Sequence, residues 1–467
     1  MLKTNLAFDS VDLREKDRRH TVHGWTNYSK FVQEGPEILV EGDGVYVTDV
    51  YGNRLMDAMA GVWCVNVGYG RTEIVDAIAE QARRLPFANP FRATSSPSAA
   101  ELSARLSDLA PGDLDHVLYS GGGSTANDTA LRIVQRYFNT LGKVDKKGVV
   151  SRRSAYHGTT SASASLGGID AIKAGFDVSP DGVHHVSGPY AYREADGAGP
   201  DAYCDRLVEE FADLVERVGA QRIACFIAEP VMGMGGVLIP PPGYFRRISE
   251  ICKANDILIV ADEVVTGFGR LGEFLASDAV FEMSPDIISC AKGLTSGYLP
   301  LGATIISSRI MEVLRGPVAG SETFTHGFTY AEHPVCCAAA LANIDIIERE
   351  GICGHVRAMS GHFRTSVESL LDFDIVGDVR GAGFMFAIES VADRKTRALF
   401  PPEVDIGERI AGHARRLGLI VRPGGHLNIF SPPLTMTRTD VEYLTDTLRR
   451  SIRSTMDDLV REGLWRG

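Results

Sequence analysis

Short apolar runs alternate with amphipathic stretches from about residue 114 to residue 308. This alternation is typical of strands and helices wound into a mostly parallel sheet. The clearest buried strands are expected at residues 222–228 and 257–261, and two more at residues 287–290 and 302–306. Open α/β sheets bind ligands beyond the carboxyl ends of their strands, so a functional site is expected there.

The chain on either side of this region has a different pattern. Residues 38–48 alternate and contain a turn at residues 42–44, which predicts a hairpin rather than a crossover unit. Beyond residue 337, a long helical stretch precedes two strand-like segments, residues 383–387 and 419–422, and a helix through residues 441–456. This part of the pattern predicts a smaller α+β unit.

Two loop-like segments interrupt the central region. A proline-rich stretch at residues 240–242 and a glycine-rich stretch at residues 267–272 both come after expected strands. Ligand loops are common in such places, so we expect ligand contacts in these two segments.

Composition and charge narrow the classes of protein. The 467 residues are 44% hydrophobic and 23% charged, which is enough for a sizeable core. A formal net charge of -12 disfavours nucleic acid and anionic membranes as partners. Residues 1–19 are charged and resemble no signal peptide, and no later run is long enough for a membrane span, so a cytoplasmic location is expected. The eight scattered cysteines predict neither disulfides nor a metal site.

A glycine turn opens a helix after the apolar pair Val117-Leu118. Residues 119–125 read Tyr-Ser-Gly-Gly-Gly-Ser-Thr, and Ala130, Val134 and Phe138 then fall on one helix face. Free amides, hydroxyls and the positive end of a helix can bind a phosphate dianion. No lysine follows, which disfavours a nucleotide P-loop. Alone, the segment fits an ordinary strand-to-helix turn equally well.

Two charged residues follow expected strands. Asp262 comes directly after residues 257–261, and a carboxylate there could pair with a protonated pyridine nitrogen or cap the next helix. Lys292 follows residues 287–290. A partly desolvated amine has a lowered proton affinity and can form a Schiff base, although a lone lysine in such a place is more often a surface residue.

At this point the sequence resembles the class III aminotransferases, which are fold-type-I enzymes dependent on pyridoxal 5′-phosphate (PLP), and within them the ω-amino acid or amine:pyruvate group. The matching segments are residues 59–71, 156–158, 261–264, 267–270, 291–293, 327–330 and 333–334. The resemblance spans nearly the whole chain. It implies a large domain with a mostly parallel seven-stranded sheet and a smaller α+β domain built from both termini.

The resemblance also implies a division of the chain into three parts. Residues 1–75 would contribute to the small domain, residues 76–336 would form the large cofactor-binding domain, and residues 337–467 would form the C-terminal α+β domain. The implied partners are a small-molecule amine and a keto acid, together with a second copy of the chain in a homodimer. Two dimers pairing into a tetramer would be compatible with this.

Roles at the cofactor follow from the resemblance. Lys292 would form the Schiff base and shuttle protons, and Asp262 would pair with the pyridine nitrogen. Tyr156 would stack on one ring face and Val264 would touch the other. His157 would be either a cofactor-site residue or a structural neighbour of Tyr156.

The phosphate of the cofactor would be bound from two subunits. Gly123, Ser124 and Thr125 would bind it from one chain, and Phe328 and Thr329 would reach it from the partner chain. The sequence departs from the family here, because residues 122–125 read Gly-Gly-Ser-Thr where family members commonly have Ser-Gly-Ser-Glu. The contribution of Thr125 is therefore left open.

Substrate residues are implied in the same way. The side chains expected to form an apolar slot for the amine are Trp25, Val62, Trp63 and Phe91. Arg422 would bind the carboxylate of the keto acid, for which a bidentate guanidinium is suited. Related γ-aminobutyrate and ornithine enzymes have a glutamate where this chain has Met234, which favours pyruvate over 2-oxoglutarate as the acceptor.

The expected reaction is a ping-pong transamination, and three rivals are weighed against it. An aminomutase or a decarboxylase would share the fold and the cofactor. A nucleotide-dependent oxidoreductase would need a Gly-x-Gly-x-x-Gly turn, which the segment at residues 119–125 lacks. A catalytically silent protein would not need the full set of catalytic residues. The sequence does not name the amine, and β-alanine, taurine, a diamine or an aryl amine all fit.

Overall fold

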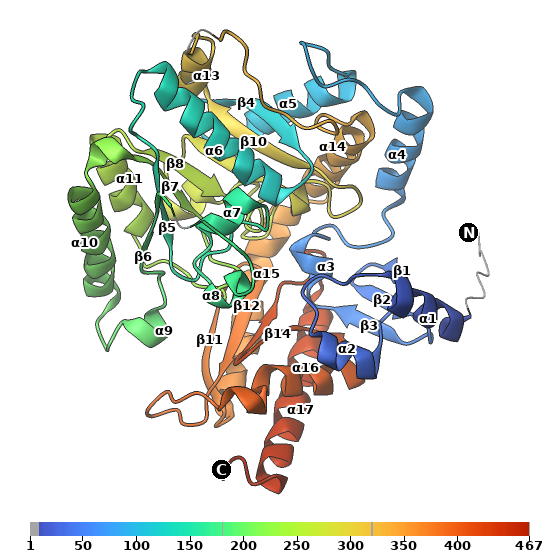
Figure 1. Ribbon diagram of the computed structural model, residues 1–467. Helices are drawn as coiled ribbons and strands as arrows, with labels where there is room; N and C mark the ends of the chain where they lie inside the picture. Colours follow the sequence, from blue (N-terminus) through green and yellow to red (C-terminus); the bar gives the residue numbers. More distant parts are fainter. Residues whose placement is uncertain (1–8, 180, 319–320, 467) are drawn as a thin grey trace.

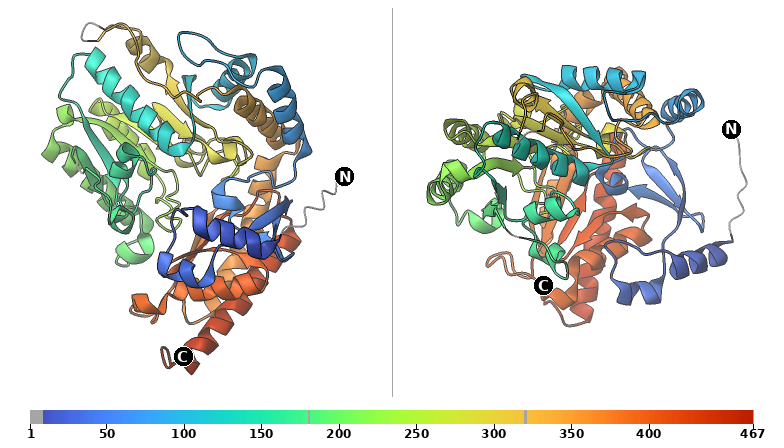
Figure 2. Two further views of the ribbon diagram at one scale, coloured as in Figure 1. Left: turned by 45° about the vertical axis from the view of Figure 1, so that its right-hand side comes forward. Right: turned by 45° about the horizontal axis from the view of Figure 1, so that its top comes forward.

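The computed structural model describes residues 9–179, 181–318 and 321–466 (Figure 1). Residues 1–8, which begin the charged segment considered above, lie outside the described residues. The molecule has a larger part built on a seven-stranded sheet and a smaller part that combines segments from the N-terminal and C-terminal regions of the chain (Figures 1 and 2). None of the helices in the described residues has the length and apolar character needed to cross a membrane.

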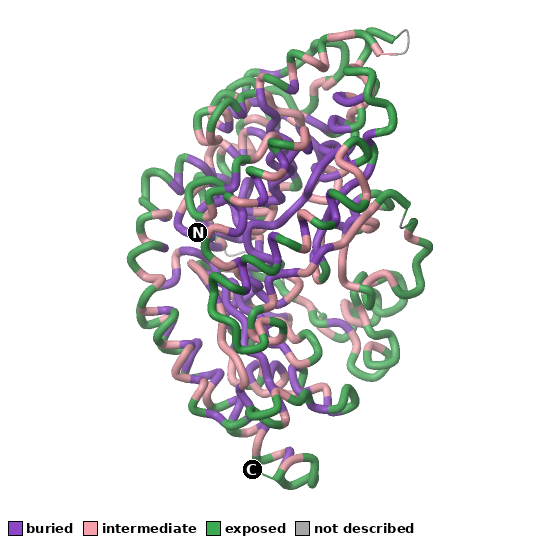
Figure 3. The backbone as a smooth tube through the Cα atoms, turned by 90° about the vertical axis from the view of Figure 1, so that its left-hand side faces the viewer, coloured by how far each residue is buried: buried purple, intermediate pink, exposed green. Residues whose placement is uncertain are grey.

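The large sheet confirms the predicted architecture. Its strand order is β4-β10-β9-β8-β7-β5-β6, and β10 is antiparallel to both neighbours while the other pairs are parallel. The strands are β4 (Leu114–Ser120), β5 (Gly148–Arg152), β6 (Val183–Val186), β7 (Ile223–Ala228), β8 (Leu258–Asp262), β9 (Ile287–Cys290) and β10 (Gly302–Ser307). The residues of the central strands are all buried, which explains their unbroken apolar runs (Figure 3).

Helices surround this sheet (Figure 1). They are α4 (Thr72–Arg84), α5 (Pro97–Leu109), α6 (Gly123–Thr140), α7 (Ser161–Leu166), α8 (Asp170–Lys173), α9 (Ala191–Glu194), α10 (Pro200–Val218), α11 (Tyr244–Ala254), α12 (Ser277–Phe281), α13 (Ser308–Leu314) and α14 (Pro334–Arg349), with 3-10 turns η1 (Ala220–Arg222) and η2 (Lys292–Leu294). Ala130, Val134 and Phe138 of α6 are buried, so the predicted apolar face is confirmed.

The small part contains two four-stranded sheets. One has the order β1-β2-β3-β13 and the other β11-β12-β15-β14. The strands are β1 (Leu39–Asp43), β2 (Tyr46–Asp49), β3 (Arg54–Asp57), β11 (Val376–Ala382), β12 (Met385–Ser390), β13 (Leu419–Ile420), β14 (Arg422–Gly424) and β15 (Leu427–Phe430). The predicted hairpin is the antiparallel pair β1 and β2. Because β13 runs parallel to β3, segments from the two ends of the chain share one sheet (Figure 2).

Helices flank these two sheets. They are α1 (Ser10–His20), α2 (Tyr28–Glu34), α3 (Ala60–Trp63), α15 (Ile352–Glu368), α16 (Ile406–Arg416) and α17 (Arg438–Arg461), with 3-10 turns η3 (Ser369–Asp372) and η4 (Pro402–Val404). The long helix expected near the C-terminus is α17. The division of the chain at residues 75 and 336 stays a prediction.

One predicted strand is divided in the structure. Residues 419–422 were expected to form a single strand, but Leu419 and Ile420 pair with β3 while Arg422 begins β14 in the other small sheet. The chain changes sheets at Val421, and this places Arg422 at the junction of the two sheets.

The glycine-rich segment 267–272 has a different role from the one expected. Its Arg270 is fully buried and donates to the carbonyl oxygens of Phe384 and Pro432 and to Oδ1 of Asn66. The Asn66 amide donates in return to the carbonyl oxygen of Phe268 at 2.8 Å. Through Arg270 and the Phe268 carbonyl, the segment therefore connects the large part to the small part, and the Arg270 guanidinium is enclosed by protein.

Candidate active site

Lys292 and Asp262 lie at the same edge of the large sheet. Asp262 is the last residue of β8 and pairs in register with Ser289 of the adjacent parallel strand β9. Lys292 follows β9 by two residues and begins η2 with a positive φ of 45°. Adjacent parallel strands that end together bring these two side chains to one site, where open α/β sheets bind ligands.

The Asp262 carboxylate is buried and organised by three donors. Its Oδ2 accepts from the side-chain amide of Asn127 and lies beside Nδ1 of His157, both at 2.8 Å. Among the described residues, its Oδ1 accepts only from the backbone amide of Val264, at 3.1 Å. Because Oδ2 is fully engaged, Oδ1 is the oxygen that can bind a further donor, such as a protonated ring nitrogen.

Lys292 is in an environment that favours the neutral amine. Burial lowers the pKa of Lys292, and the nearby Cys64, Asp262 and Glu229 oppose the shift. A neutral amine is the form that attacks a carbonyl carbon. The Lys292 Nζ also lies 5.6 Å from the ring centroid of Trp63, so the amine and the indole belong to one site.

The start of α6 lies close to the same site. A Cβ on Gly123 would be 2.7 Å from Cγ1 of Val264, so Gly123 packs against the residue that follows Asp262 by two positions. Ser124 Oγ accepts from the amide of Thr159 at 3.1 Å, and the Thr125 hydroxyl donates to the Gly122 carbonyl at 2.9 Å. Because the Thr125 hydroxyl is already engaged, the backbone amides of the first turn are the better phosphate donors.

We expect Gly123→Ala to weaken cofactor binding about tenfold, because the added methyl would push the first turn of α6 away from Val264. Absorbance titration with PLP measures the dissociation constant. Val264→Ala alone is the matched control, and the double variant should recover most of the loss because it removes the clashing methyl groups. Equal dissociation constants for Gly123→Ala and the parent would contradict this account of the helix start.

Tyr156 and Trp63 line one side of the site. The Tyr156 ring lies edge-on to Trp25 with centroids 5.9 Å apart, and its backbone amide donates to Oε1 of Glu229 at 3.1 Å. Trp63 is 2% exposed, and its indole packs so closely on Gly233 that a Cβ there would collide with it. Trp25 is 64% exposed, so it covers the outer side of Tyr156.

Met234 and Arg422 contact each other across the site. Nη1 of Arg422 approaches Sδ of Met234, and both side chains are half-buried. Burial lowers the pKa of Arg422, and Tyr156 opposes this shift. No carboxylate pairs with Arg422 among the described residues, so its guanidinium is available to an anionic ligand. Val62, from the same turn as Trp63, is 62% exposed.

Phe91 lies with the segment that contains Phe328 and Thr329. A Cβ on Gly327 would be 2.9 Å from Phe91, and the half-buried Phe328 and exposed Thr329 follow directly. The neighbouring Phe87 and Tyr330 have ring centroids 6.1 Å apart, and Tyr330 is 70% exposed. These residues form an exposed aromatic surface.

Two residues of the site, Asn127 and Glu229, were not assigned a role from the sequence. Asn127 is buried on the face of α6 that also carries Ala130, Val134 and Phe138, and an amide among these apolar residues could have been noticed. Glu229 was left without a role. It is buried, its carboxylate accepts from the amides of Tyr156 and Gly233, and burial raises its pKa. It therefore links the cofactor side of the site to the Trp63 side.

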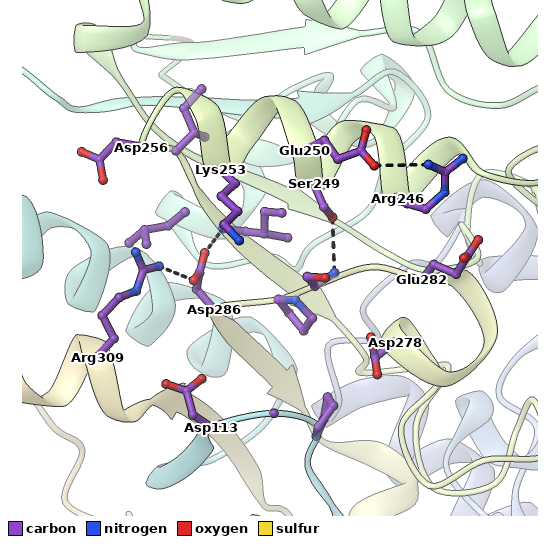
Figure 4. A pocket seen from close by; sticks show the side chains of 17 residues that line it. Asp113, Arg246, Ser249, Glu250, Lys253, Asp256, Asp278, Glu282, Asp286 and Arg309 are labelled. Atoms are coloured by element: carbon purple, nitrogen blue, oxygen red, sulfur yellow. Dashed lines mark hydrogen bonds and ion pairs between the residues drawn. The ribbon is translucent and has the colours of Figure 1, made fainter.

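A cavity of about 690 Å³ lies at the opposite end of the sheet (Figure 4). Its lining includes Asp286, Lys253 and Arg309, near the amino-terminal ends of β8 and β9. The Asp286 carboxylate pairs with Arg309 and accepts a hydrogen bond from the backbone amide of Ile259. None of the predicted site residues lines this cavity, so we do not assign the chemistry to it.

The described residues fit pyridoxal phosphate at the first site. Asp262 Oδ1 can accept from a ring nitrogen, Lys292 supplies a desolvated amine, and the first turn of α6 has no room for a side chain at Gly123. His157 contacts Asp262 through Nδ1, and its buried Nε2 has no hydrogen-bond partner among the residues that the structure describes.

Comparison with known proteins gives consistent results. The family described as aminotransferase class-III matches residues 29–452. The putrescine–pyruvate aminotransferase of Pseudomonas aeruginosa is 41% identical over 439 residues, covering 94% of this chain and 95% of that protein. The diaminobutyrate–2-oxoglutarate transaminase of Halomonas elongata is 36% identical over 460 residues, covering 97% and 98%.

Solved structures are similar over almost the same length. A thermostable (S)-enantioselective omega-transaminase from Thermomicrobium roseum superposes with a TM-score of 0.93 at 39% identity, covering 96% of this chain and 99% of that one. The PMP-bound form of an aminotransferase from Vibrio fluvialis has a TM-score of 0.92 at 33% identity, covering 95% and 98%.

Proposed function

The chain belongs to the class III aminotransferases, which depend on PLP, and we propose that it moves the amino group of a primary amine or ω-amino acid to pyruvate. The observation that carries this proposal is the placement of Lys292 and Asp262 at the ends of the adjacent strands β9 and β8. An amine and a carboxylate at one sheet edge are what the two ends of the cofactor ring need.

The residues of this chain have separate tasks in the proposed reaction. When bound, PLP supplies an electron sink that stabilises negative charge at the substrate carbon. Lys292 would hold the cofactor between turnovers, and its amine, when free, would move a proton at the substrate carbon. Asp262 would keep a proton on the ring nitrogen through Oδ1, while Asn127 and His157 fix the orientation of its carboxylate.

Tyr156 and Val264 would contact the two faces of the cofactor ring. The Tyr156 backbone is fixed by Glu229, and the amide of Val264 is fixed by Asp262. Gly123 and Ser124 would bind the phosphate with the amides of the first turn of α6. Thr125 contributes through its backbone, because its hydroxyl binds Gly122.

The amine would contact apolar side chains of the site, and the keto acid would contact a charged one. Trp63, with Val62 and Trp25, offers an apolar wall to the carbon chain of the amine. Arg422 would pair with the carboxylate of pyruvate in the second half of the reaction. Met234 contacts Arg422 without neutralising it, so the guanidinium keeps its charge for a small keto acid.

We further propose that the active enzyme is a homodimer with shared active sites. The exposed aromatic surface around Phe91 and Tyr330 supports this, because a second copy would remove it from water. In such a dimer, Phe328 and Thr329 would reach the phosphate of the partner site and Phe91 would close its amine slot. A cytoplasmic location stays a prediction.

The test is a panel of primary amines with pyruvate and 2-oxoglutarate as competing acceptors. We expect alanine to form at least about tenfold faster than glutamate. The absence of amino transfer to either acceptor, with carbon dioxide or an isomerised amine as the product, would favour the decarboxylase or aminomutase alternative. Formation of glutamate alone would overturn the choice of acceptor and leave transamination intact.

Arg422→Leu separates the two half-reactions of the same proposal. We expect the KM for pyruvate to rise about tenfold or more, because the keto-acid carboxylate would lose its bidentate partner. Single-turnover rates with an apolar amine should change little in the same variant, which serves as the internal control. An unchanged KM for pyruvate would exclude Arg422 as the carboxylate-binding residue.

A further inference from the structure

The turn after β3 has a backbone conformation that needs external support. Ala60, Gly61 and Trp63 have φ angles of 48°, 69° and 63°, all in the left-handed region. Ala60 and Trp63 carry a Cβ, which makes this conformation unfavourable for them. The contacts around the turn must therefore hold it in place.

Asp57 provides this support. It is the last residue of β3 and is 4% exposed. Its Oδ1 accepts from the amide of Met59 at 2.9 Å, and its Oδ2 accepts from the amide of Gly61 at 2.6 Å. The Tyr69 hydroxyl donates to the same Oδ2 at 2.7 Å. Three donors on one buried carboxylate fix the start of the turn, because charge-assisted hydrogen bonds are strong.

The turn determines where Trp63 lies. The buried indole packs against Gly233, and the Lys292 Nζ lies 5.6 Å from its ring centroid. Its Nε1 has no hydrogen-bond partner among the described residues, so no bond of its own fixes the ring. The position of the indole therefore depends on the backbone of the turn and on the packing against Gly233.

We propose that Asp57 and Tyr69 are positioning residues for the amine slot. Through the amides of Met59 and Gly61 they hold the Trp63 indole in place, and they thereby determine which amines the slot accepts. This inference rests on the proposed function, because the slot is the amine-binding part of that proposal. Neither residue touches the reacting atoms.

The kinetic test compares Asp57→Asn and Tyr69→Phe with Asp49→Asn. Asp49 is a matched control because it is also buried at the end of a strand of this sheet and accepts from the backbone amides of Tyr51 and Asn53. We expect kcat/KM for 1-phenylethylamine, relative to isopropylamine, to fall about tenfold in Asp57→Asn and about threefold in Tyr69→Phe. The ratio should not change in Asp49→Asn, although its stability should fall.

The second readout follows the indole directly. The chain has three tryptophans, so Trp25→Phe with Trp465→Phe leaves Trp63 as the only tryptophan, whose emission can be excited apart from that of the 14 tyrosines. In this background, with PLP bound, iodide should quench Trp63 at least about twofold more effectively after Asp57→Asn. A role in stability alone would not expose the indole in the folded enzyme.

The outcomes separate this inference from the proposed function. Unchanged amine ratios and unchanged quenching in Tyr69→Phe and Asp57→Asn would overturn the positioning role. If Asp57→Asn does not fold, Tyr69→Phe decides, because it removes a single hydroxyl. If no amine is transferred to any keto acid, the proposed function fails, while iodide quenching still decides whether Asp57 positions Trp63.

Discussion

Replacing Lys292 by alanine is expected to lower kcat by at least about a thousandfold, because both the covalent hold on the cofactor and the proton transfer are lost. The absorbance band of the lysine-bound cofactor should disappear as well. Steady-state rates and an absorption spectrum of the purified enzyme measure the two effects. Turnover close to that of the parent would reject Lys292 as the catalytic lysine.

Lys146→Ala is the matched control for this variant. Lys146 is buried, it donates to the carbonyl oxygens of Ala220 and Asn255, and burial lowers its pKa as it does for Lys292. Its removal should reduce stability without removing the absorbance band. A loss of the band in both variants would point to unfolding rather than to lost chemistry.

Replacing Asp262 by asparagine is expected to lower kcat by about a hundredfold to a thousandfold, because a neutral amide stabilises a protonated ring nitrogen much less than a carboxylate does. The change keeps the size of the side chain, so the cofactor should still bind through Lys292. Single-turnover kinetics with a saturating amine measures the chemical step. An unchanged rate would exclude the pairing of Asp262 with the ring nitrogen.

Asp286→Asn is the control for this second variant. Asp286 lies at the other end of the same sheet, accepts from the amide of Ile259 at 2.8 Å and pairs with Arg309. Its replacement removes a carboxylate from β9's amino-terminal side and should leave the chemical step unchanged. Comparing the two variants therefore shows whether the chemical step depends on the carboxylate at the carboxyl end of the sheet or on the one at its amino-terminal end.

The sequence pattern predicted the strands β7 to β10 of the large sheet because all of their residues are buried. The apolar runs that became β7, β8 and β9 leave little choice of structure, and they place Asp262 and Lys292 at strand ends. The resemblance to a known family added the cofactor, which strand patterns alone could not identify.

The sequence did not predict features that depend on contacts between distant segments. Residues 419–422 look like one strand, and only pairing with β3 shows that the strand ends before Arg422. The role of Asp57 depends on Tyr69 and on a turn with positive φ angles, which no local pattern indicates. Arg270 looks like a loop residue, and its burial follows from packing between the two parts of the molecule.

The parallel pair of β3 and β13 has a consequence for synthesis on the ribosome. Strand β13 is synthesised long after β3, so the sheet that supports Trp63 and leads to Arg422 cannot close until residues 419–420 have emerged. The large sheet, in contrast, is finished once β10 has emerged. The large sheet, with Asp262 and Lys292 at its edge, can therefore form on the nascent chain before the sheet behind the amine slot closes.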